Sequence, residues 1–206
     1  MRSTDLLDLS PVVPVAVLED AEHAVPLARA LLHGGIRTIE VTLRTNAALS
    51  SVERIAAEVP EIVVGVGTVT ESGQAKAAAD AGARYLVTPG WTERLLDEVD
   101  STGLPNLPGV STVSEALRLA ERGARALKFF PAEPSGGIPY LKALSSPLPE
   151  LRFCPTGGIS QVSAADYLAL PNVGCVGGSW LSDPKLLAAG EWDRIETLAR
   201  EAAALR

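Results

Sequence analysis

The sequence predicts an α/β protein, a single (β/α)8 TIM barrel with a short N-terminal helix. Short runs rich in β-branched residues alternate with stretches rich in Ala, Leu, Glu and Arg, which is the pattern of βα units. Eight such runs occur, and their starts lie 19 to 26 residues apart. No linker, charge run or low-complexity segment divides the chain, so we expect residues 1–206 to form one domain.

Each candidate strand is an apolar run that stops at a glycine, a proline or a helical stretch. The strands are Val12–Val17, Thr38–Leu43, Val63–Val69, Tyr85–Pro89, Leu104–Val110, Ala126–Pro131, Arg152–Thr156 and Val173–Gly178. Between them lie helical stretches that end at stop signals, for example Ala21–Leu32, Ala47–Val59 and Ser72–Ala81. Eight units of similar length favour a closed barrel over an open sheet.

Composition and charge exclude several classes of function. Lys and Arg total 18 against 25 Asp and Glu, a net charge of −7, so we expect no nucleic-acid partner. The longest uncharged stretch, Tyr167–Ser182, is too short to span a membrane and contains Pro171, so we expect no membrane segment. Near the start, Asp5 and Asp8 interrupt what would be the apolar core of a signal peptide; we expect a short amphipathic helix capped by Thr4 and a cytoplasmic protein.

The sequence also predicts no cofactor and no metal. The first strand is followed by Leu18-Glu19-Asp20, without the glycines of a dinucleotide site. The two cysteines, Cys154 and Cys175, and the two histidines show no metal-ligand spacing. We expect both cysteines to be small buried residues without a redox role.

Polar residues recur at every second position of the second strand. In Thr38–Leu43 and the two residues after it, Glu40, Thr42 and Arg44 share the face opposite the apolar residues, so they point into the barrel. A Glu40–Arg44 ion pair without a function explains the pattern equally well. Thr68, at the end of the third strand, is expected inside near Glu40, although a threonine without a ligand fits as well.

Lys128 lies in the middle of the apolar strand Ala126–Pro131. Lysine is almost never fully buried without a partner, and desolvation favours the neutral amine that a nucleophile requires. A lysine paired with a carboxylate such as Glu40 is the structural alternative, and the two interpretations are compatible. Glu133, after Pro131, is expected at the start of a helix rather than in catalysis.

The last two strands each end in a pair of glycines, Gly157-Gly158 and Gly177-Gly178. In this fold a phosphate commonly binds the loops after strands seven and eight, where glycines let backbone N–H groups approach the anion. One such pair is more often a tight turn, but two pairs on the expected strands favour a phosphate site that includes Ser179.

With these motifs, the sequence resembles the bacterial 2-dehydro-3-deoxy-phosphogluconate aldolase family, whose members often also act on 4-hydroxy-2-oxoglutarate. The motifs are PVVPV at 11–15, GGIRTIEVTLRT at 34–45, VGVGTV at 64–69, TPG at 88–90, PGVST at 108–112, KFFPAE at 128–133, RFCPTGGI at 152–159 and GGSWL at 177–181. The resemblance implies a class I aldolase that assembles as a homotrimer. It implies that Lys128 forms a Schiff base, that Glu40 is the general acid/base and that Arg44 holds the pyruvyl carboxylate.

The implied substrate is a phosphorylated 2-keto-3-deoxy sugar acid, which is cleaved to pyruvate and glyceraldehyde 3-phosphate. The substrate-binding residues are then expected to be Arg44, Thr68, Pro89, Phe130, Thr156, Gly157, Gly158, Gly178 and Ser179. Three alternatives stay open. The first is an aldolase of the same family for the galactonate epimer or chiefly for unphosphorylated hydroxy-oxoglutarate; the others are a phosphosugar isomerase or epimerase, and a non-catalytic phosphate-binding barrel.

Overall fold

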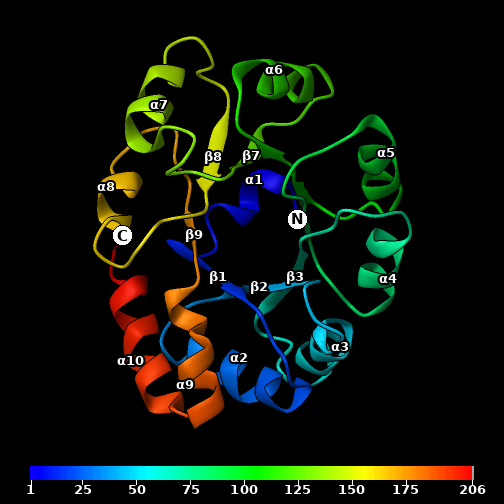
Figure 1. Cartoon of the computed structure of the whole chain (residues 1–206), viewed down its shortest axis with the longest axis vertical. Coiled ribbons are helices and arrows are strands. Elements are labelled where there is room, and N and C mark those ends of the chain that lie inside the picture. Colours follow the sequence, from blue (N-terminus) through cyan, green and yellow to red (C-terminus); the bar gives the residue numbers. More distant parts are fainter. Residues whose placement is uncertain (206) are drawn as a thin grey trace.

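The computed structural model describes residues 1–205 of the chain. Figure 1 shows the strands in the middle of the molecule and the helices around the outside. The strands are β1 (Val12–Ala16), β2 (Thr38–Thr42), β3 (Val63–Gly67), β4 (Leu86–Val87), β5 (Asn106–Leu107), β6 (Gly109–Val110), β7 (Ala126–Phe129), β8 (Arg152–Pro155) and β9 (Val176–Gly178). Their pairs are parallel, which confirms the predicted α/β class.

The single eight-stranded sheet that the sequence predicts is not confirmed. The described strands form a six-stranded sheet, in the order β5-β4-β3-β2-β1-β9, and a three-stranded sheet, in the order β6-β7-β8. The expected strand 104–110 is split because Pro108 has no N–H to donate to a neighbouring strand. Isolated bridges from Phe153 to Val173 and from Thr156 to Gly177 link β8 to the last strand and the residues before it.

The helices alternate with the strands along the chain, as expected. They are α1 (Ser3–Leu6), α2 (Ala24–His33), α3 (Ala48–Glu58), α4 (Gln74–Asp80), α5 (Glu93–Ser101), α6 (Val113–Glu121), α7 (Gly137–Leu144), α8 (Ala164–Leu168), α9 (Pro184–Ala189) and α10 (Trp192–Ala203), with 3-10 turns η1 (Ala21–His23) and η2 (Trp180–Ser182). The expected helix 21–32 therefore begins as a 3-10 turn. The expected helices 47–59 and 72–81 are present with slightly shorter bounds.

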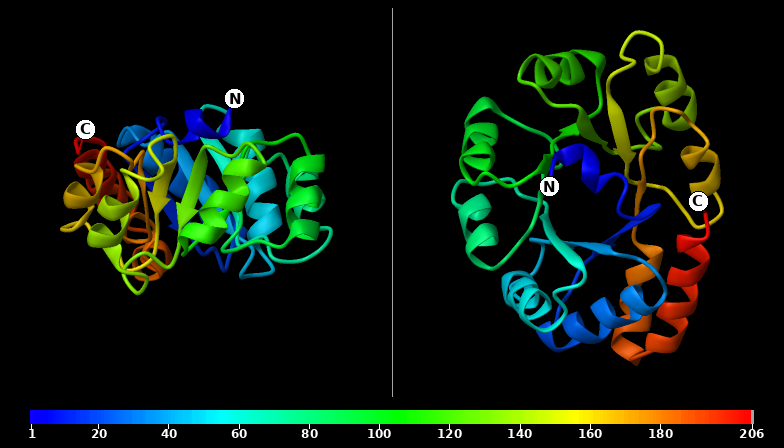
Figure 2. Two further views of the ribbon diagram at one scale, coloured as in Figure 1. Left: turned by 90° about the horizontal axis from the view of Figure 1, so that it is seen from above. Right: turned by 180° about the vertical axis from the view of Figure 1, so that it is seen from behind.

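The short N-terminal helix is present, but the expected Thr4 cap is wrong. Arg2 occupies the cap position, and its backbone N–H donates to the Asp5 carboxylate at 2.8 Å. Thr4 lies inside the helix, because the Asp5 carboxylate already satisfies the N–H at the helix start. Figure 2 shows α1 lying across one end of the ring of strands. Its last residue, Leu6, and the following Leu7 are buried there.

The apolar core has two parts, which follow from the alternation of side chains along each strand. Val12 packs in the larger cluster, with residues of the surrounding helices, whereas Val13 belongs to a smaller cluster inside the ring. The inner cluster contains one residue from each of several strands and is closed by α1. Its members are Leu6, Leu7, Val13, Val63, Tyr85, Val87, Leu107, Ala126, Cys154 and Cys175. Within residues 1–205, none of the helices has the length and apolar character needed to cross a membrane.

Candidate active site

Lys128 and Glu40 form a buried ion pair inside the ring of strands. Lys128 lies in β7 of the smaller sheet and Glu40 in β2 of the larger one, and the Lys128 Nζ donates to the Glu40 Oε1 at 3.2 Å. The two residues are only 5% and 3% exposed. A buried ion pair loses about as much in desolvation as it gains in attraction, so stability alone is a weak reason for it. A chemical role for the amine and the carboxylate explains the buried position of the pair better than stability does.

Space for the Glu40 carboxylate comes from Gly67, at the end of β3. A methyl group on Gly67 would lie 1.9 Å from the Glu40 Oε1, the oxygen that accepts from Lys128. The strand β3 lies directly beside β2, and beyond Val63 its inner face has only the glycines Gly65 and Gly67. The carboxylate therefore occupies a volume that any larger residue at position 67 would fill.

The second glycine of β3 accommodates the ring of Tyr85. A methyl group on Gly65 would lie 2.2 Å from this ring. The Tyr85 hydroxyl accepts a hydrogen bond from Thr38 at 3.0 Å. Burial raises the pKa of Tyr85, and the negative charge of Glu40 raises it further, so the phenol stays neutral. A neutral polar group thus lies near Glu40 inside the ring.

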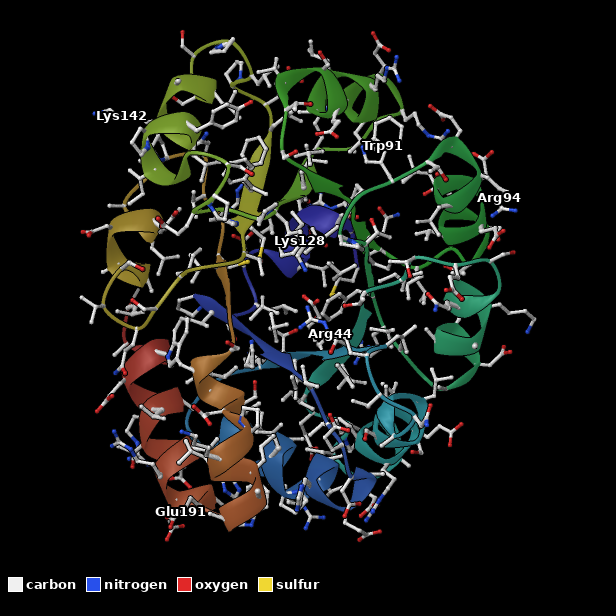
Figure 3. The ribbon with its side chains drawn as sticks, in the orientation of Figure 1. Arg44, Trp91, Arg94, Lys128, Lys142 and Glu191 are labelled. Atoms are coloured by element: carbon white, nitrogen blue, oxygen red, sulfur yellow. The ribbon has the colours of Figure 1, made fainter. Side chains whose placement is uncertain are left out.

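Arg44 and Thr68 follow the C-terminal ends of β2 and β3. Arg44 is exposed, and Figure 3 shows it in the middle of the ring of strands, as it shows Lys128. Among the described residues Glu40 pairs with Lys128 and not with Arg44, so the alternative of a Glu40–Arg44 ion pair is wrong. Thr68 has a backbone φ of 60°, a left-handed conformation that is an outlier for a β-branched residue. Within residues 1–205, no hydrogen bond joins the side chain of Thr68 to Glu40.

The residues expected to bind phosphate lie at the ends of β8 and β9. Gly157 and Gly158 have φ values of +103° and +83°, which side chains rarely adopt. Gly178 lies beneath the indole of Trp180, since a methyl group there would lie 1.8 Å from the ring. Ser179 follows and is exposed.

Three other candidates lie near this end of the strands. Phe130 follows β7, and its ring centroid is 5.3 Å from the Lys128 Nζ. Thr156 is 7% exposed, and its hydroxyl fills the space left by Gly177. Pro89 follows β4 and is half-buried. Because the carboxyl ends of parallel strands meet at one edge, these three residues lie at the same edge of the strands.

The expected burial of the two cysteines is confirmed, whereas the expected role of Glu133 is not. Cys154 and Cys175 are buried, as expected, and hydrogen bonding to Cys175, followed by the charge of Lys128, lowers the pKa of the Cys154 thiol despite burial. The expectation that Glu133 starts a helix is wrong. The next helix, α7, begins four residues later, and Glu133 instead accepts a short hydrogen bond from the Tyr167 hydroxyl.

Sequence reasoning missed Gly67 and Tyr85, which lie beside Glu40, and also the contact between Tyr167 and Glu133. The alternation of Gly65 and Gly67 was a usable signal for the first two, because glycine in a strand often marks a close approach of another group. No comparable signal points to Tyr167, whose partner Glu133 lies 34 residues away in sequence.

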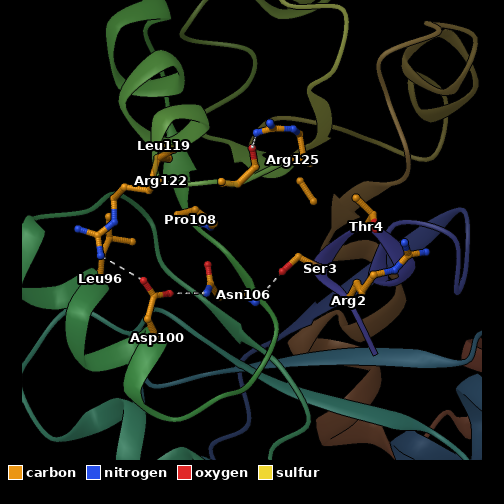
Figure 4. A pocket seen from close by; sticks show the side chains of 13 residues that line it. Arg2, Ser3, Thr4, Leu96, Asp100, Asn106, Pro108, Leu119, Arg122 and Arg125 are labelled. Atoms are coloured by element: carbon orange, nitrogen blue, oxygen red, sulfur yellow. Dashed lines mark hydrogen bonds and ion pairs between the residues drawn. The ribbon is translucent and has the colours of Figure 1, made fainter.

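A cavity of about 420 Å³ lies elsewhere, at the opposite ends of the strands (Figure 4). Asn106 and Ala126, the first residues of β5 and β7, line it, and no expected site residue does. Its arginines are already paired, as Arg122 is with Asp100 at 3.2 Å. Within residues 1–205, no group of three His, Cys, Asp or Glu side chains is placed to hold a metal ion.

Comparison with known proteins connects this geometry to a family. The family model for KDPG and KHG aldolase matches residues 4–198. The "2-dehydro-3-deoxy-phosphogluconate aldolase" of Pseudoalteromonas atlantica is 50% identical, over 99% of this chain and 95% of its own length. The "KHG/KDPG aldolase" of Escherichia coli K12 is also 50% identical, over 96% of this chain and 92% of its own.

A solved structure is similar over the whole chain. The KDPG aldolase of Legionella pneumophila, with pyruvate captured at low pH as a covalent carbinolamine intermediate, has a TM-score of 0.96 and 41% identity. The alignment covers 98% of both chains.

Proposed function

Because the chain belongs to the KDPG and KHG aldolase family, we propose that it is a class I aldolase that cleaves 2-dehydro-3-deoxy-6-phosphogluconate to pyruvate and glyceraldehyde 3-phosphate. It also cleaves 4-hydroxy-2-oxoglutarate to pyruvate and glyoxylate, the KHG activity in the name of the E. coli relative. The observation that carries the proposal is the buried Lys128–Glu40 pair, with 3.2 Å between Nζ and Oε1. An isomerase would need a proton-transfer group but no buried amine, so this observation favours the aldolase.

The reaction begins when the neutral Lys128 amine attacks the C2 ketone of the substrate. Glu40, at 3.2 Å, is the nearest group to take the proton that the amine must lose. Loss of water from the carbinolamine gives a protonated imine, which is an electron sink. Glu40, directly or through one water, then removes the proton of the C4 hydroxyl, and the C3–C4 bond breaks.

The aldehyde product leaves, and the electron pair of the broken bond remains in an enamine on Lys128. Protonation at C3, by the same carboxyl group, restores the imine. Hydrolysis then releases pyruvate and the free amine. The short Lys128–Glu40 distance lets one carboxyl group serve each of these proton transfers.

The remaining residues at this end of the strands hold the two ends of the substrate. Arg44 has a planar fork of donors that matches the pyruvyl carboxylate, with Thr68 near it. Phe130, Pro89 and Thr156 line the path between this end and the amine. Backbone N–H groups of Gly157, Gly158, Gly178 and Ser179 bind the phosphate.

Borohydride trapping with pyruvate, followed by peptide mass spectrometry, tests the proposal. A reduced pyruvyl adduct on Lys128, absent in Lys128→Ala, is the expected result. An intact protein that binds sugar phosphates but forms no adduct would overturn the aldolase mechanism and favour the isomerase. Cleavage assays with the gluconate and galactonate epimers then identify the preferred substrate.

The same proposal includes the assembly. We propose that residues 1–206 form one domain with the architecture of a (β/α)8 barrel; the isolated bridges between β8 and the last strand, which join the two sheets on one side, support this. Three copies form a homotrimer, as the resemblance to the family implies. Sedimentation velocity checks this: a single species of three times the 21.5 kDa chain mass is expected.

A further inference from the structure

Two loops at the C-terminal ends of the strands are joined through Glu133. One is the loop between β7 and α7, which contains Glu133, and the other is the turn Gly157-Gly158 after β8. The Ala132 N–H donates to the Thr156 carbonyl at 2.8 Å, and the Glu133 N–H donates to the Gly157 carbonyl at 3.0 Å. The backbone on the β8 side of the turn is therefore fixed to the first loop.

The side chain of Glu133 covers the other half of the turn. A methyl group on Gly158 would lie 2.6 Å from the Glu133 Cγ, so this side chain packs directly on the glycine. Its carboxylate then accepts a short hydrogen bond from the hydroxyl of Tyr167, in α8. Glu133 thus connects the turn to the helix that follows it, and we call the Glu133–Tyr167 hydrogen bond the strap.

The surroundings of Tyr167 suit a permanent contact. Tyr167 is fully buried, and burial, followed by the hydrogen bond to Glu133, raises the pKa of its hydroxyl, which therefore remains a donor at neutral pH. Gly137 leaves room for the strap, since a methyl group there would lie 2.9 Å from the Tyr167 Oη. Without the strap, two adjacent glycines would have wide conformational freedom.

We propose that the strap determines specificity for phosphorylated substrates, by holding the Gly157-Gly158 turn in the shape that binds phosphate. The proposal rests on the proposed function, because it concerns the phosphate end of the aldolase substrate. An anion bound by backbone N–H groups depends on their fixed orientation, so a loosened turn weakens its binding. The amine and carboxylate that break the C3–C4 bond lie on β7 and β2, and the strap does not touch them. Loss of the strap therefore raises KM for the phosphorylated substrate only.

The test compares two substrates in Tyr167→Phe, which lacks only the hydroxyl. For 2-dehydro-3-deoxy-6-phosphogluconate we expect KM to rise about tenfold, the factor that about 1.4 kcal/mol of lost binding produces, with kcat unchanged. For 4-hydroxy-2-oxoglutarate, which has no phosphate, both constants should stay within twofold of wild type. Glu133→Ala should reproduce the effect, and because Glu133 is exposed, this variant keeps the test valid if Tyr167→Phe does not fold. Glu133→Gln retains an acceptor for Tyr167 and should restore most of the preference.

Tyr140→Phe is the matched control. It removes a tyrosine hydroxyl from α7, where the ring stacks on Phe129 with centroids 5.4 Å apart, and this hydroxyl makes no hydrogen bond among the described residues. It should behave as wild type with both substrates. An equal effect of Tyr167→Phe on both substrates, or no effect on either, would overturn the inference while leaving the aldolase intact. A wild-type protein that cleaves neither substrate would instead overturn the proposed function, and the inference with it.

Discussion

The Lys128–Glu40 pair and the cluster around Arg122 have similar hydrogen-bond distances but opposite surroundings. Lys128 has one carboxylate partner at 3.2 Å, and both side chains are at most 6% exposed. Arg122 contacts Glu93 and Asp97 at 2.7 Å each and Asp100 at 3.2 Å, with carboxylates that are at least 50% exposed. Water replaces a lost partner at the surface, whereas inside the ring a lost partner leaves an uncompensated charge. The number of ion pairs that a residue makes therefore does not indicate whether it lies in the active site.

Among the substitutions that test this comparison, Glu40→Gln should have the largest effect on activity. The amide keeps the shape of the side chain but cannot accept a proton, so kcat should fall about a hundredfold to ten-thousandfold, the range for loss of a general acid/base. Pyruvate release, measured with a coupled dehydrogenase, gives kcat. Borohydride trapping of pyruvate on Lys128 should still occur slowly, which separates the loss of proton transfer from loss of the nucleophile. A kcat within threefold of wild type would exclude Glu40 from the proton transfers.

Gly67→Ala tests whether the carboxylate needs the space beside it. The added methyl would lie 1.9 Å from the Glu40 Oε1, so the carboxylate must move away from Lys128. Overpacking of this kind costs about 1–3 kcal/mol of stability, and because a misplacement of about 1 Å can cost about a hundredfold in rate, we expect kcat to fall by about tenfold to a hundredfold. Gly90→Ala is the control, because a methyl group there meets nothing within 4 Å. Equal activity of the two variants would show that Glu40 tolerates the displacement.

Thr68→Gly tests the strained backbone beside the ion pair. Glycine adopts a φ of 60° without the steric cost that threonine has, so the free energy of unfolding should rise by about 1 kcal/mol. The activity should fall at the same time, because the hydroxyl that we propose lies near the pyruvyl carboxylate is lost. Denaturant unfolding and the KM for substrate measure the two effects. A variant that is less stable than wild type would show that the φ of Thr68 carries no strain.

Much of the fold was predictable because each βα unit is local. The period-two pattern of β2 placed Glu40 on the inner face, and the isolated lysine of β7 indicated its partner. The points at which the sheet is interrupted were harder to predict, since a single residue such as Pro108 decides whether the hydrogen bonding between two strands continues.

The supporting contacts of the site were less predictable, because they join distant segments. Gly67 matters only because β3 lies beside β2, and Glu133 was expected to start a helix because nothing near it in sequence reveals Tyr167. A local sequence pattern reveals residues that are chemically unusual for their surroundings. It does not reveal the ordinary residues that hold them in place.

Arg122→Ala tests the exposed side of the comparison. Asp97 is the first of the carboxylates whose hydrogen bonds raise the pKa of Arg122, but the cluster is solvated, so we expect the free energy of unfolding to fall by only about 1 kcal/mol. The loss should shrink in 1 M salt, because salt screens exposed charges. Activity should not change. Denaturant unfolding at low and high salt measures the loss in the free energy of unfolding. A loss as large as that expected for a buried pair would contradict the comparison.

Glu115 lies between the two extremes, and Glu115→Gln should have the smallest effect. Burial raises the pKa of Glu115, but hydrogen bonds from Ser111 and Thr112 outweigh it and lower the pKa below its ordinary 4.5. A carboxylate with a depressed pKa stabilises the folded state above its unfolded pKa, and this contribution is lost as the pH falls through the folded value. Wild type should therefore exceed Glu115→Gln in stability by less than about 1 kcal/mol at pH 7, and the difference should shrink as the pH falls below 4.5. Denaturant midpoints across this range measure the difference. A gap that does not shrink on acidification would mean that the glutamate acts through packing at the start of α6 and not through its charge.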